Sequence, residues 1–218
     1  MKLFKLSFVI FIIFCLAGCK YSADYIDPED RYIVSAVAFQ KDNSGIKTLI
    51  EAPPAKNNPE KTLTVFSGVA DSVEKSVELT ANKISGELIF SQCPIILIDE
   101  GLKGEEIQQI FDFCMKNYDI SLSVMLSSCD NPQELLGLEQ PVMSVGHTLL
   151  KTLTNSNKQV DVSSYARFAK IINDENKNGE FYLPHIIIEN ETFSIDCMCF
   201  YKNKKLENFV NIGAFNNG

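Results

Sequence analysis

The sequence predicts an α+β fold, in which helices pack on a mixed β-sheet, and three observations lead to this prediction. Two runs of almost purely apolar residues rich in β-formers, 32–40 and 95–98, are typical of strands buried on both faces. Between these runs, apolar residues recur at helical spacing, as they do over residues 73–84. Turn-forming residues separate the segments. Strands and helices in this order indicate a mixed sheet covered by helices.

The first nineteen residues have the three-part layout of a secretory signal peptide. Lys2 and Lys5 give a positive start, residues 8–16 are uncharged and apolar, and Ala17 and Gly18 precede Cys19. This apolar segment is shorter than the roughly 20 residues that a membrane-spanning helix needs.

A cleavage site of small residues that ends on a cysteine resembles the bacterial lipoprotein signal, or lipobox. The resemblance implies that residues 1–18 are removed as a lipoprotein signal peptide and that Cys19 carries a diacylglycerol thioether. It also implies that the new amino group of Cys19 can be acylated, and two or more acyl chains anchor a protein durably. A plain secreted protein with an incidental Cys19 and an uncut signal anchor are the alternatives.

Length and charge narrow the class of protein. Cleavage before Cys19 leaves 200 of the 218 residues, enough for one large domain or two small ones. The chain has 20 Lys and Arg against 28 Asp and Glu, a net charge of −8, which speaks against nucleic-acid binding. Lys202, Lys204 and Lys205 are the densest basic group and are interpreted as a solvated hairpin turn. No second apolar run approaches membrane-spanning length.

Five cysteines remain after Cys19, an odd number, so at least one has no partner within the chain. They are Cys93, Cys114, Cys129, Cys197 and Cys199. Apolar neighbours surround Cys93, Cys114, Cys197 and Cys199, and buried thiols are the interpretation we favour for these four. On a strand, Cys197 and Cys199 would share one face and could ligate a metal. The chain has two histidines, neither at ligand spacing, so we predict no metal site and no cofactor other than the lipid on Cys19.

After the signal peptide, an acidic spacer is predicted over residues 19–31 and a single domain over residues 32–218. Strands are expected over residues 32–40 and 46–52, joined as a hairpin by a turn at 41–45, and a third over 62–69 after a loop at 53–61. A helix over 73–84 follows, with Asp71 as its cap and Gly86 at its end. Residues 95–98 are expected to form the central strand.

The second half is predicted to hold helices and then a hairpin. A helix over residues 107–118 turns Tyr118 toward the core, and a strand follows over 122–126. Asp130, Asn131 and Pro132 signal the start of a short helix. Helices are expected over 143–153 and 162–172, and Gly146 weakens the prediction of the first. A polar turn is expected over 173–179, followed by a hairpin of residues 186–188 and 193–201. Residues 206–218 are expected to form a weakly ordered tail.

Catalytic motifs are absent from the sequence: it has no Gly-rich phosphate loop, no His-Glu-x-x-His and no Gly-x-Ser-x-Gly. A nucleophile paired with a base, such as Cys129 with His147 or Cys93 with His185, stays open but nothing favours it. We therefore predict no catalytic residue and a protein that is not an enzyme.

One pair of carboxylates stands at a position where ligands bind. Asp99 and Glu100 end the central strand, and ligands favour the carboxyl ends of strands in α/β sheets. The alternative is a solvated turn that caps the following helix.

The order of these segments resembles the Ger(x)C family, the C subunits of nutrient germinant receptors, which are spore germination lipoproteins. The lipobox cysteine comes first, followed by a strand, a Lys41-Asp42 turn and a helix over 71–84. The most specific stretch is 88–100, which is similar to the family's strand Leu-aromatic-aromatic-Gly-His-x-Lys, a run of aliphatic residues and an acidic pair. Segments 107–118, 121–127 and 132–136 reproduce the family's helix, strand and short helix. Leu183-Pro184 and residues 199–204 look like its Leu-Pro and its aromatic-Lys-x-x-Lys close.

Three departures accompany the resemblance, which covers roughly residues 19–206. Gln92 stands where the family usually has a histidine, Lys20-Tyr21 replaces Trp-Asp after the lipid cysteine, and the chain stops after the first of three family domains. The resemblance implies a non-catalytic lipoprotein on the outer face of the spore inner membrane, working with two integral membrane subunits of the A and B type. The alternative function is an extracytoplasmic substrate-binding lipoprotein of a transporter.

Overall fold

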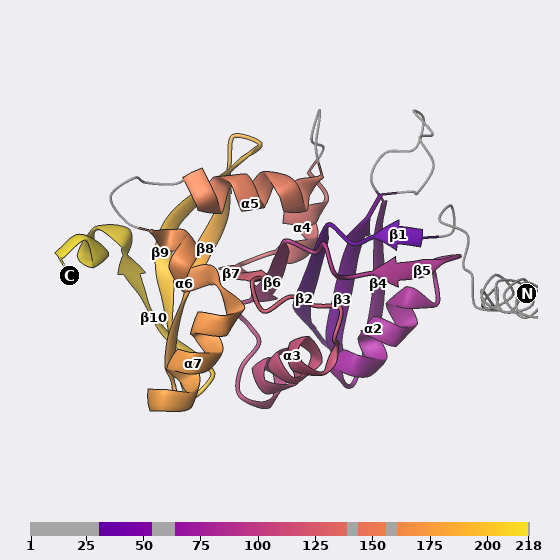
Figure 1. Cartoon of the computed structure of the whole chain (residues 1–218), viewed down its shortest axis with the longest axis horizontal. Helices are drawn as coiled ribbons and strands as arrows, with labels where there is room; N and C mark the ends of the chain where they lie inside the picture. The colour runs from indigo at the N-terminus through magenta and orange to yellow at the C-terminus, as the bar shows by residue number, and fades with distance from the viewer. Residues whose placement is uncertain (1–30, 54–63, 139–143, 156–160, 218) are drawn as a thin grey trace, which may run out of the picture.

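An eight-stranded mixed β-sheet forms the centre of the protein, and its strand order is β10-β9-β8-β7-β6-β2-β3-β4 (Figure 1). The computed structural model describes residues 31–53, 64–138, 144–155 and 161–217. The strands are β2 Ala36–Asp42, β3 Gly45–Ala52, β4 Thr64–Ala70, β6 Ile95–Asp99, β7 Met125–Cys129, β8 Glu180–Glu189, β9 Thr192–Lys202 and β10 Lys205–Asn211. The predicted α+β class with a mixed sheet is confirmed.

The middle of the sheet is parallel and its two sides are antiparallel. β2, β6, β7 and β8 run in the same direction, whereas β2-β3-β4 and β8-β9-β10 are antiparallel meanders. β6 and β7 pair over five residues, but β7 and β8 share a single registered pair, Ser128 with His185. The β7–β8 junction is therefore the weakest seam of the sheet.

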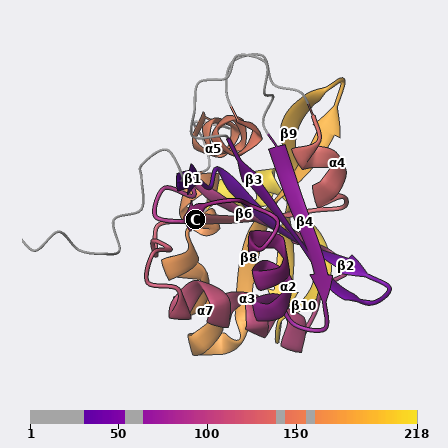
Figure 2. The same ribbon diagram turned by 90° about the vertical axis from the view of Figure 1, so that its right-hand side faces the viewer.

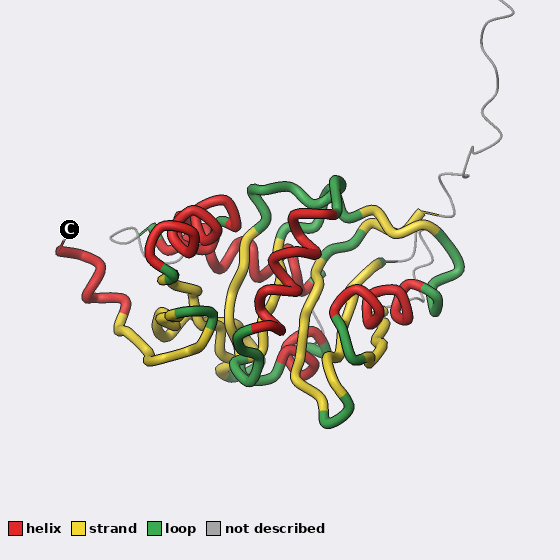
Figure 3. The backbone as a smooth tube through the Cα atoms, turned by 90° about the horizontal axis from the view of Figure 1, so that it is seen from below, coloured by secondary structure: helices red, strands yellow, loops and turns green. Residues whose placement is uncertain are grey.

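Helices cover both faces of the sheet (Figures 1 and 2). On one face lie α2 Val73–Ala81, α3 Glu105–Lys116 and α7 Phe168–Asn178, which pack on the strands seen from below in Figure 3. On the other face lie α4 Pro132–Leu136, α5 Val145–Asn155 and α6 Val162–Ala166. Each face has its own apolar core, so the parallel strands are buried on both sides, as their apolar sequences predict.

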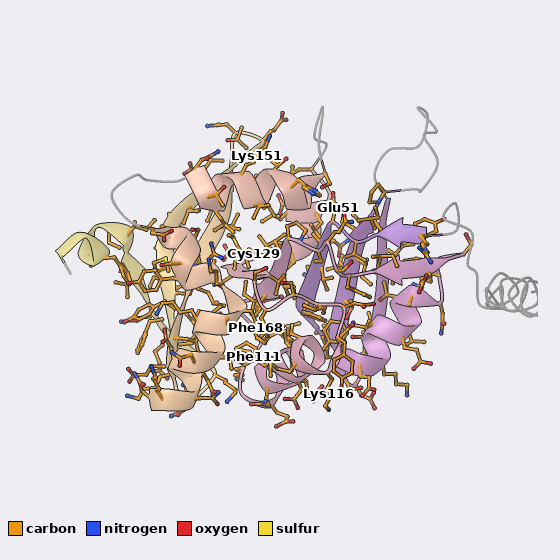
Figure 4. All side chains as sticks on the ribbon, in the orientation of Figure 1. Glu51, Phe111, Lys116, Cys129, Lys151 and Phe168 are labelled. Carbon is orange, nitrogen blue, oxygen red and sulfur yellow. The ribbon has the colours of Figure 1, made fainter. Side chains whose placement is uncertain are left out.

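Aromatic side chains join the two halves of the first core. The Phe111 ring on α3 lies 5.7 Å from Phe168 on α7 and 5.5 Å from Phe181 on β8, between centroids (Figure 4). Phe181 in turn stacks on Tyr201 of β9, and the Tyr201 hydroxyl lies 3.2 Å from the Ser128 hydroxyl on β7. Side-chain packing thus bridges the seam where backbone pairing is sparse.

A second, two-stranded sheet corrects the strand expected over residues 32–40. β1 Arg31–Ile33 pairs in parallel with β5 Glu87–Ile89, and β2 begins only at Ala36. The chain changes sheets between them: the Val34 N–H donates to the Ile89 carbonyl and the Ser35 N–H to the Glu51 carbonyl.

Two helix boundaries and one strand start also differ from the expectation. α2 starts after Ser72 and ends at Ala81, so Asp71 is not its cap and Gly86 does not end it. Tyr118 follows the end of α3 and is fully exposed, because the helix stops two residues earlier. The strand expected from residue 122 begins at Met125, and Leu122 is exposed.

The helix expected over 162–172 is two helices. Arg167 has extended backbone angles between α6 and α7 and forms a β-bridge with Met125. α7 then runs through most of the expected polar turn to Asn178, where Gly179 in the left-handed region, with φ +68°, ends it.

The expected weakly ordered tail is an ordered edge of the sheet. β10 pairs with β9, and a 3₁₀ segment, η2 Ile212–Asn217, follows. The turn between β9 and β10 is Asn203-Lys204, whose positive φ values of 49° and 58° suit a tight hairpin. The interpretation of the lysines near residue 204 as a hairpin turn is confirmed.

Several other expectations are confirmed and some lie outside the described residues. The hairpin of β2 and β3, the central strand β6, the short helix α4 capped by Asn131, and the final hairpin of β8 and β9 are all present. The signal peptide, Cys19, most of the loop at 53–61 and the loop at 156–159 lie outside the described residues. The division into 1–18, 19–31 and 32–218 therefore stays a prediction. Among the described residues, no helix combines the length and the apolar composition needed to cross a membrane.

Candidate functional site

Polar side chains meet where the parallel strands β6 and β7 end. Asp99 is the last residue of β6 and Glu100 follows it, while Asp130 directly follows β7. His185 lies beside Ser128 in the neighbouring strand β8, so its ring reaches the same edge. Parallel strands deliver their carboxyl ends to one edge of a sheet, and that edge is where α/β sheets bind ligands.

Three carboxylates surround the His185 ring, and we call His185, Glu100, Asp130 and Asp196 the His185 cluster. Nε2 lies 2.8 Å from Glu100 Oε1 and 3.2 Å from Asp130 Oδ1, and Nδ1 lies 2.7 Å from Asp196 Oδ1. The ring of Phe209, from the edge strand β10, meets the imidazole edge to face at 5.5 Å between centroids. Both ring nitrogens thus have carboxylate partners, and these contacts fix the orientation of the ring.

The carboxylates determine the charge of this histidine. The His185 side chain is only 6% exposed. Burial lowers its pKa, but the hydrogen bonds to Glu100 and Asp196 and the charges of both carboxylates outweigh burial and raise the pKa to about 9. In the absence of another cation, the ring is a buried imidazolium at neutral pH.

A β-bulge aims Asp196 at the ring. The register between β8 and β9 shifts at His185 and Ile186, which pair with Cys197 and Ile195 and leave Asp196 as the extra residue. A bulge re-aims a side chain that would otherwise alternate with its neighbours. The sequence gives no signal for this bulge, and Asp196 was not singled out from it.

Asp99 and Glu100, the pair singled out from the sequence, have different roles in the structure. Glu100 contacts His185, whereas Asp99 accepts hydrogen bonds from the backbone N–H groups of Lys41 at 3.0 Å and Gly101 at 2.7 Å. Burial raises the pKa of Asp99, although those two hydrogen bonds oppose the rise. Asp99 therefore braces the strand-to-helix turn, but it does not cap α3, whose N-cap is Gly104.

The two cysteine–histidine pairs left open by the sequence do not form hydrogen bonds in the structure. His147 lies on α5, and its Nδ1 is 2.7 Å from the Ser144 hydroxyl. The Cys93 thiol donates to the Ile95 carbonyl at 3.3 Å, and burial raises its pKa to about 12. A protonated, buried thiol is a poor nucleophile.

The five thiols are free and mostly buried. Cys93, Cys114, Cys129 and Cys199 are buried, and Cys197 is half-buried. The burial expected for Cys93, Cys114 and Cys199 is confirmed, whereas Cys197, which was also expected to be buried, is only half-buried. Alternation along β9 puts Cys197 and Cys199 on one face. Cys199 Sγ lies 3.9 Å from Glu100 Oε1, so this face adjoins the His185 cluster.

Glu51 is a second buried carboxylate, and it has a structural role. It lies on β3 and accepts hydrogen bonds from the N–H groups of Val145 at 2.7 Å and Gly146 at 2.9 Å, the first two residues of α5, and from the Ser35 hydroxyl at 2.7 Å (Figure 4). A carboxylate at a helix N-terminus satisfies free N–H groups and interacts favourably with the helix dipole. Glu51 thus fixes α5 over the sheet.

Two of the surface cavities are relevant to a binding site. One, of about 330 Å³, lies between α4 and β8 and is lined by Asp130, Asn131 and Glu134 among others. The other, of about 440 Å³, lies between α2 and α3 beside Phe113. Of these two, the first adjoins the His185 cluster, through Asp130.

Two sets of donor atoms in this region have the spacing of metal ligands. One set is Glu100, Asp130 and His185, and the other is His185, Asp196 and Cys197; in each, the donor atoms lie within 4.8 Å of one another. The first set could not be found from spacing along the chain, because its members come from strands that lie far apart in the sequence. The second set lies on the hairpin of β8 and β9, where the register shift beside His185 brings its members together.

Comparison with known proteins gives one family and one solved structure. The sequence model of the family described as "spore germination protein N-terminal domain" matches residues 24–188. Among curated proteins, no match is found. The crystal structure of the GerBC protein is similar at 12% sequence identity with a TM-score of 0.41, over 81% of this chain and 52% of that chain. This chain therefore spans about half the length of the GerBC chain it matches.

Proposed function

Since the chain belongs to the family of spore germination protein N-terminal domains, with a match over residues 24–188, we propose that it is a lipid-anchored, non-catalytic subunit of a nutrient germinant receptor. Family membership carries this proposal, and it agrees with the resemblance to the Ger(x)C family. The match covers the two-stranded sheet of β1 and β5 and the strands of the eight-stranded sheet from β2 to β8, as far as residue 188. It gives no support to the alternative of a transporter's substrate-binding lipoprotein.

The anchor is the lipid on Cys19. Residues 1–18 act as the lipoprotein signal, Cys19 carries the diacylglycerol thioether, and residues 19–31 are the acidic spacer between the lipid and the domain. The subunit then stands on the outer face of the spore inner membrane. There it assembles with two integral membrane subunits of the A and B type.

The proposal of a non-catalytic role rests on the chemistry of the described side chains. Nucleophilic catalysis needs a thiolate or alkoxide next to a base. Burial raises the pKa of Cys93 to about 12 and raises that of Cys129 well above the usual thiol range, and the His185 ring is engaged by carboxylates. These groups suit an assembly and sensing module.

Membrane fractionation of dormant spores tests the proposal. Wild-type protein is expected in the spore inner membrane, and Cys19→Ala is expected to be lost from it. Cys15→Ala is the matched control, because it removes a cysteine from the same leader before the cleavage site. Protein found only in vegetative cells would overturn the germination role. If Cys19→Ala stays in the membrane, an uncut signal anchor, and not a lipid, holds the protein there.

A further inference from the structure

We propose that Glu100, Asp130 and His185 bind a divalent transition-metal cation that clips the two halves of the sheet together. The donors are Glu100 Oε1, Asp130 Oδ1 and His185 Nε2, and they lie within 4.8 Å of one another. This departs from the expectation of no metal site, which depended on the spacing of histidines along the chain. The fold, rather than that spacing, assembles the ligands.

The distances fit a small cation. Zinc binds imidazole nitrogen and carboxylate oxygen at about 2.1 Å, so donors in a tetrahedral site lie roughly 3.4 Å apart. His185 Nε2 lies 2.8 Å from Glu100 Oε1 and 3.2 Å from Asp130 Oδ1. Side-chain shifts of about half an ångström would therefore admit the ion, which replaces the proton on Nε2.

Asp196 gives the histidine the support that a metal ligand requires. A ligating histidine nearly always donates its other ring N–H to a carboxylate or carbonyl, which fixes the tautomer and the ring orientation. Asp196 Oδ1 accepts from Nδ1 at 2.7 Å, so Nε2 faces Glu100 and Asp130. The β-bulge that places Asp196 lies within the ladder of β8 and β9, where the register shifts between residues 185 and 186.

Charge and access also favour a cation. One ring faces three carboxylates, so the cluster remains negative even when the imidazole is protonated. Glu100 is 21% exposed and Asp130 is 73% exposed, and Asp130 also lines the 330 Å³ cavity beside α4. An ion can reach the site from solvent, and water can complete its coordination.

The position of the cluster indicates what the ion would do. Glu100 and Asp130 follow β6 and β7, whereas His185 and its support Asp196 belong to β8 and β9. The two groups lie on opposite sides of the β7–β8 seam, where one registered pair joins the strands. A bound cation would cross-link this seam and make the sheet rigid as a single body.

The mixed ligand set points to the class of metal. Imidazole suits zinc, copper, iron and nickel, whereas carboxylates alone suit magnesium and calcium. One histidine with two carboxylates therefore suits Zn²⁺ and discriminates against Mg²⁺. The competing set that uses Cys197 would bind zinc through sulfur and would leave Asp130 outside the site.

Calorimetric titration with ZnCl₂ tests the proposal on the full chain extracted in detergent. We expect one Zn²⁺ per chain, unaffected by equimolar Mg²⁺. Asp130→Asn should weaken binding at least about tenfold, and Asp196→Asn should weaken it about 10- to 100-fold through the loss of support for the ring. Asp119→Asn, an equal change of charge at an exposed site on the loop after α3, is the matched control.

The variants separate this site from other outcomes. His185→Gln should abolish binding, and Asp130→Asn keeps the test valid if His185→Gln does not fold, because the Asp130 side chain is mostly exposed. Cys197→Ser should bind zinc as the wild type does. No stoichiometric binding, wild-type affinity in Asp130→Asn, or a loss confined to Cys197→Ser would each overturn the proposed ligand set.

Discussion

Glu51 accepts a hydrogen bond from the backbone N–H of Gly146, 95 residues further along the chain, with 2.9 Å between Oε2 and the nitrogen. The same contact brings α5 so close to the sheet that a Cβ on Gly146 would lie 1.7 Å from the Ser35 carbonyl oxygen. The carboxylate of Glu51 and the absence of a side chain at Gly146 therefore act together to position α5. Glu51 holds the helix end, and Gly146 lets it approach.

Gly146→Ala tests the close approach. The added methyl group would overlap the Ser35 backbone, so we expect a loss of about 3 kcal/mol in the free energy of unfolding, measured by urea denaturation. Gly104→Ala is the control, since nothing lies within 4 Å of its Cβ position and only its φ of +57° is unfavourable. It should cost about 1–2 kcal/mol. Equal losses at the two positions would contradict the steric argument.

Glu51→Gln tests the carboxylate. The substitution keeps the shape of the side chain, but one of its two ends becomes an amide donor that faces a backbone or hydroxyl donor. We expect a loss of about 2–3 kcal/mol in the free energy of unfolding. Glu78→Gln, on the exposed side of α2, should change it by less than about 0.5 kcal/mol. A stability equal to wild type for Glu51→Gln would mean that the helix end finds other partners.

The raised pKa of His185 predicts how the free energy of unfolding depends on pH in chelator-treated protein. Its pKa is raised from 6.5 to about 9 in the folded state, so its contribution is complete below pH 6.5 and is lost as the pH rises toward 9. Between pH 6 and 8.5 we expect the free energy of unfolding to fall by at most about 2 kcal/mol. His185→Gln should lack this slope, and the comparison cancels the contribution of thiols, which is common to both proteins.

Thiol labelling tests the burial of the cysteines. Burial raises the pKa of Cys93 and of Cys197 to about 12, whereas an unfolded thiol has a pKa near 8.5. In native protein at pH 8, iodoacetamide should alkylate both more than about a hundredfold more slowly than in urea. Half-buried Cys197 should react first, as peptide mass spectrometry can measure. Rapid native labelling of Cys93 would contradict its burial.

The sequence predicts the buried strands well because burial on both faces leaves a continuous apolar signature. β6 and the hairpin of β2 and β3 follow from this signature. The break at Arg167 could not be predicted, because the apolar periodicity continues across it and a tertiary bridge to Met125 interrupts the helix. The edge strand β10 was missed because its residues are mostly exposed and lack the alternation of a half-buried strand.

Of the four residues of the His185 cluster, only Glu100 could be predicted from the sequence as a binding carboxylate. Asp99 and Glu100 were identified because they end a recognisable central strand. The partners of Glu100 were not, because His185 meets it only after β8 adds to the sheet and Asp196 reaches the ring only through a bulge. Glu51 was missed in the same way, since its partners lie on a helix about 95 residues away.

The sparse pairing of β7 with β8 has a consequence for the order of folding. β8, β9 and β10 are joined by short turns at Asn190-Glu191 and Asn203-Lys204, both with positive φ values, so this meander consists of local contacts. Hairpins of this kind form in roughly microseconds, whereas the pairing of β2 with β6 must first close a long loop. We therefore expect the two halves of the sheet to form separately and to dock last, and the His185 cluster to be complete only when the chain has reached its native topology.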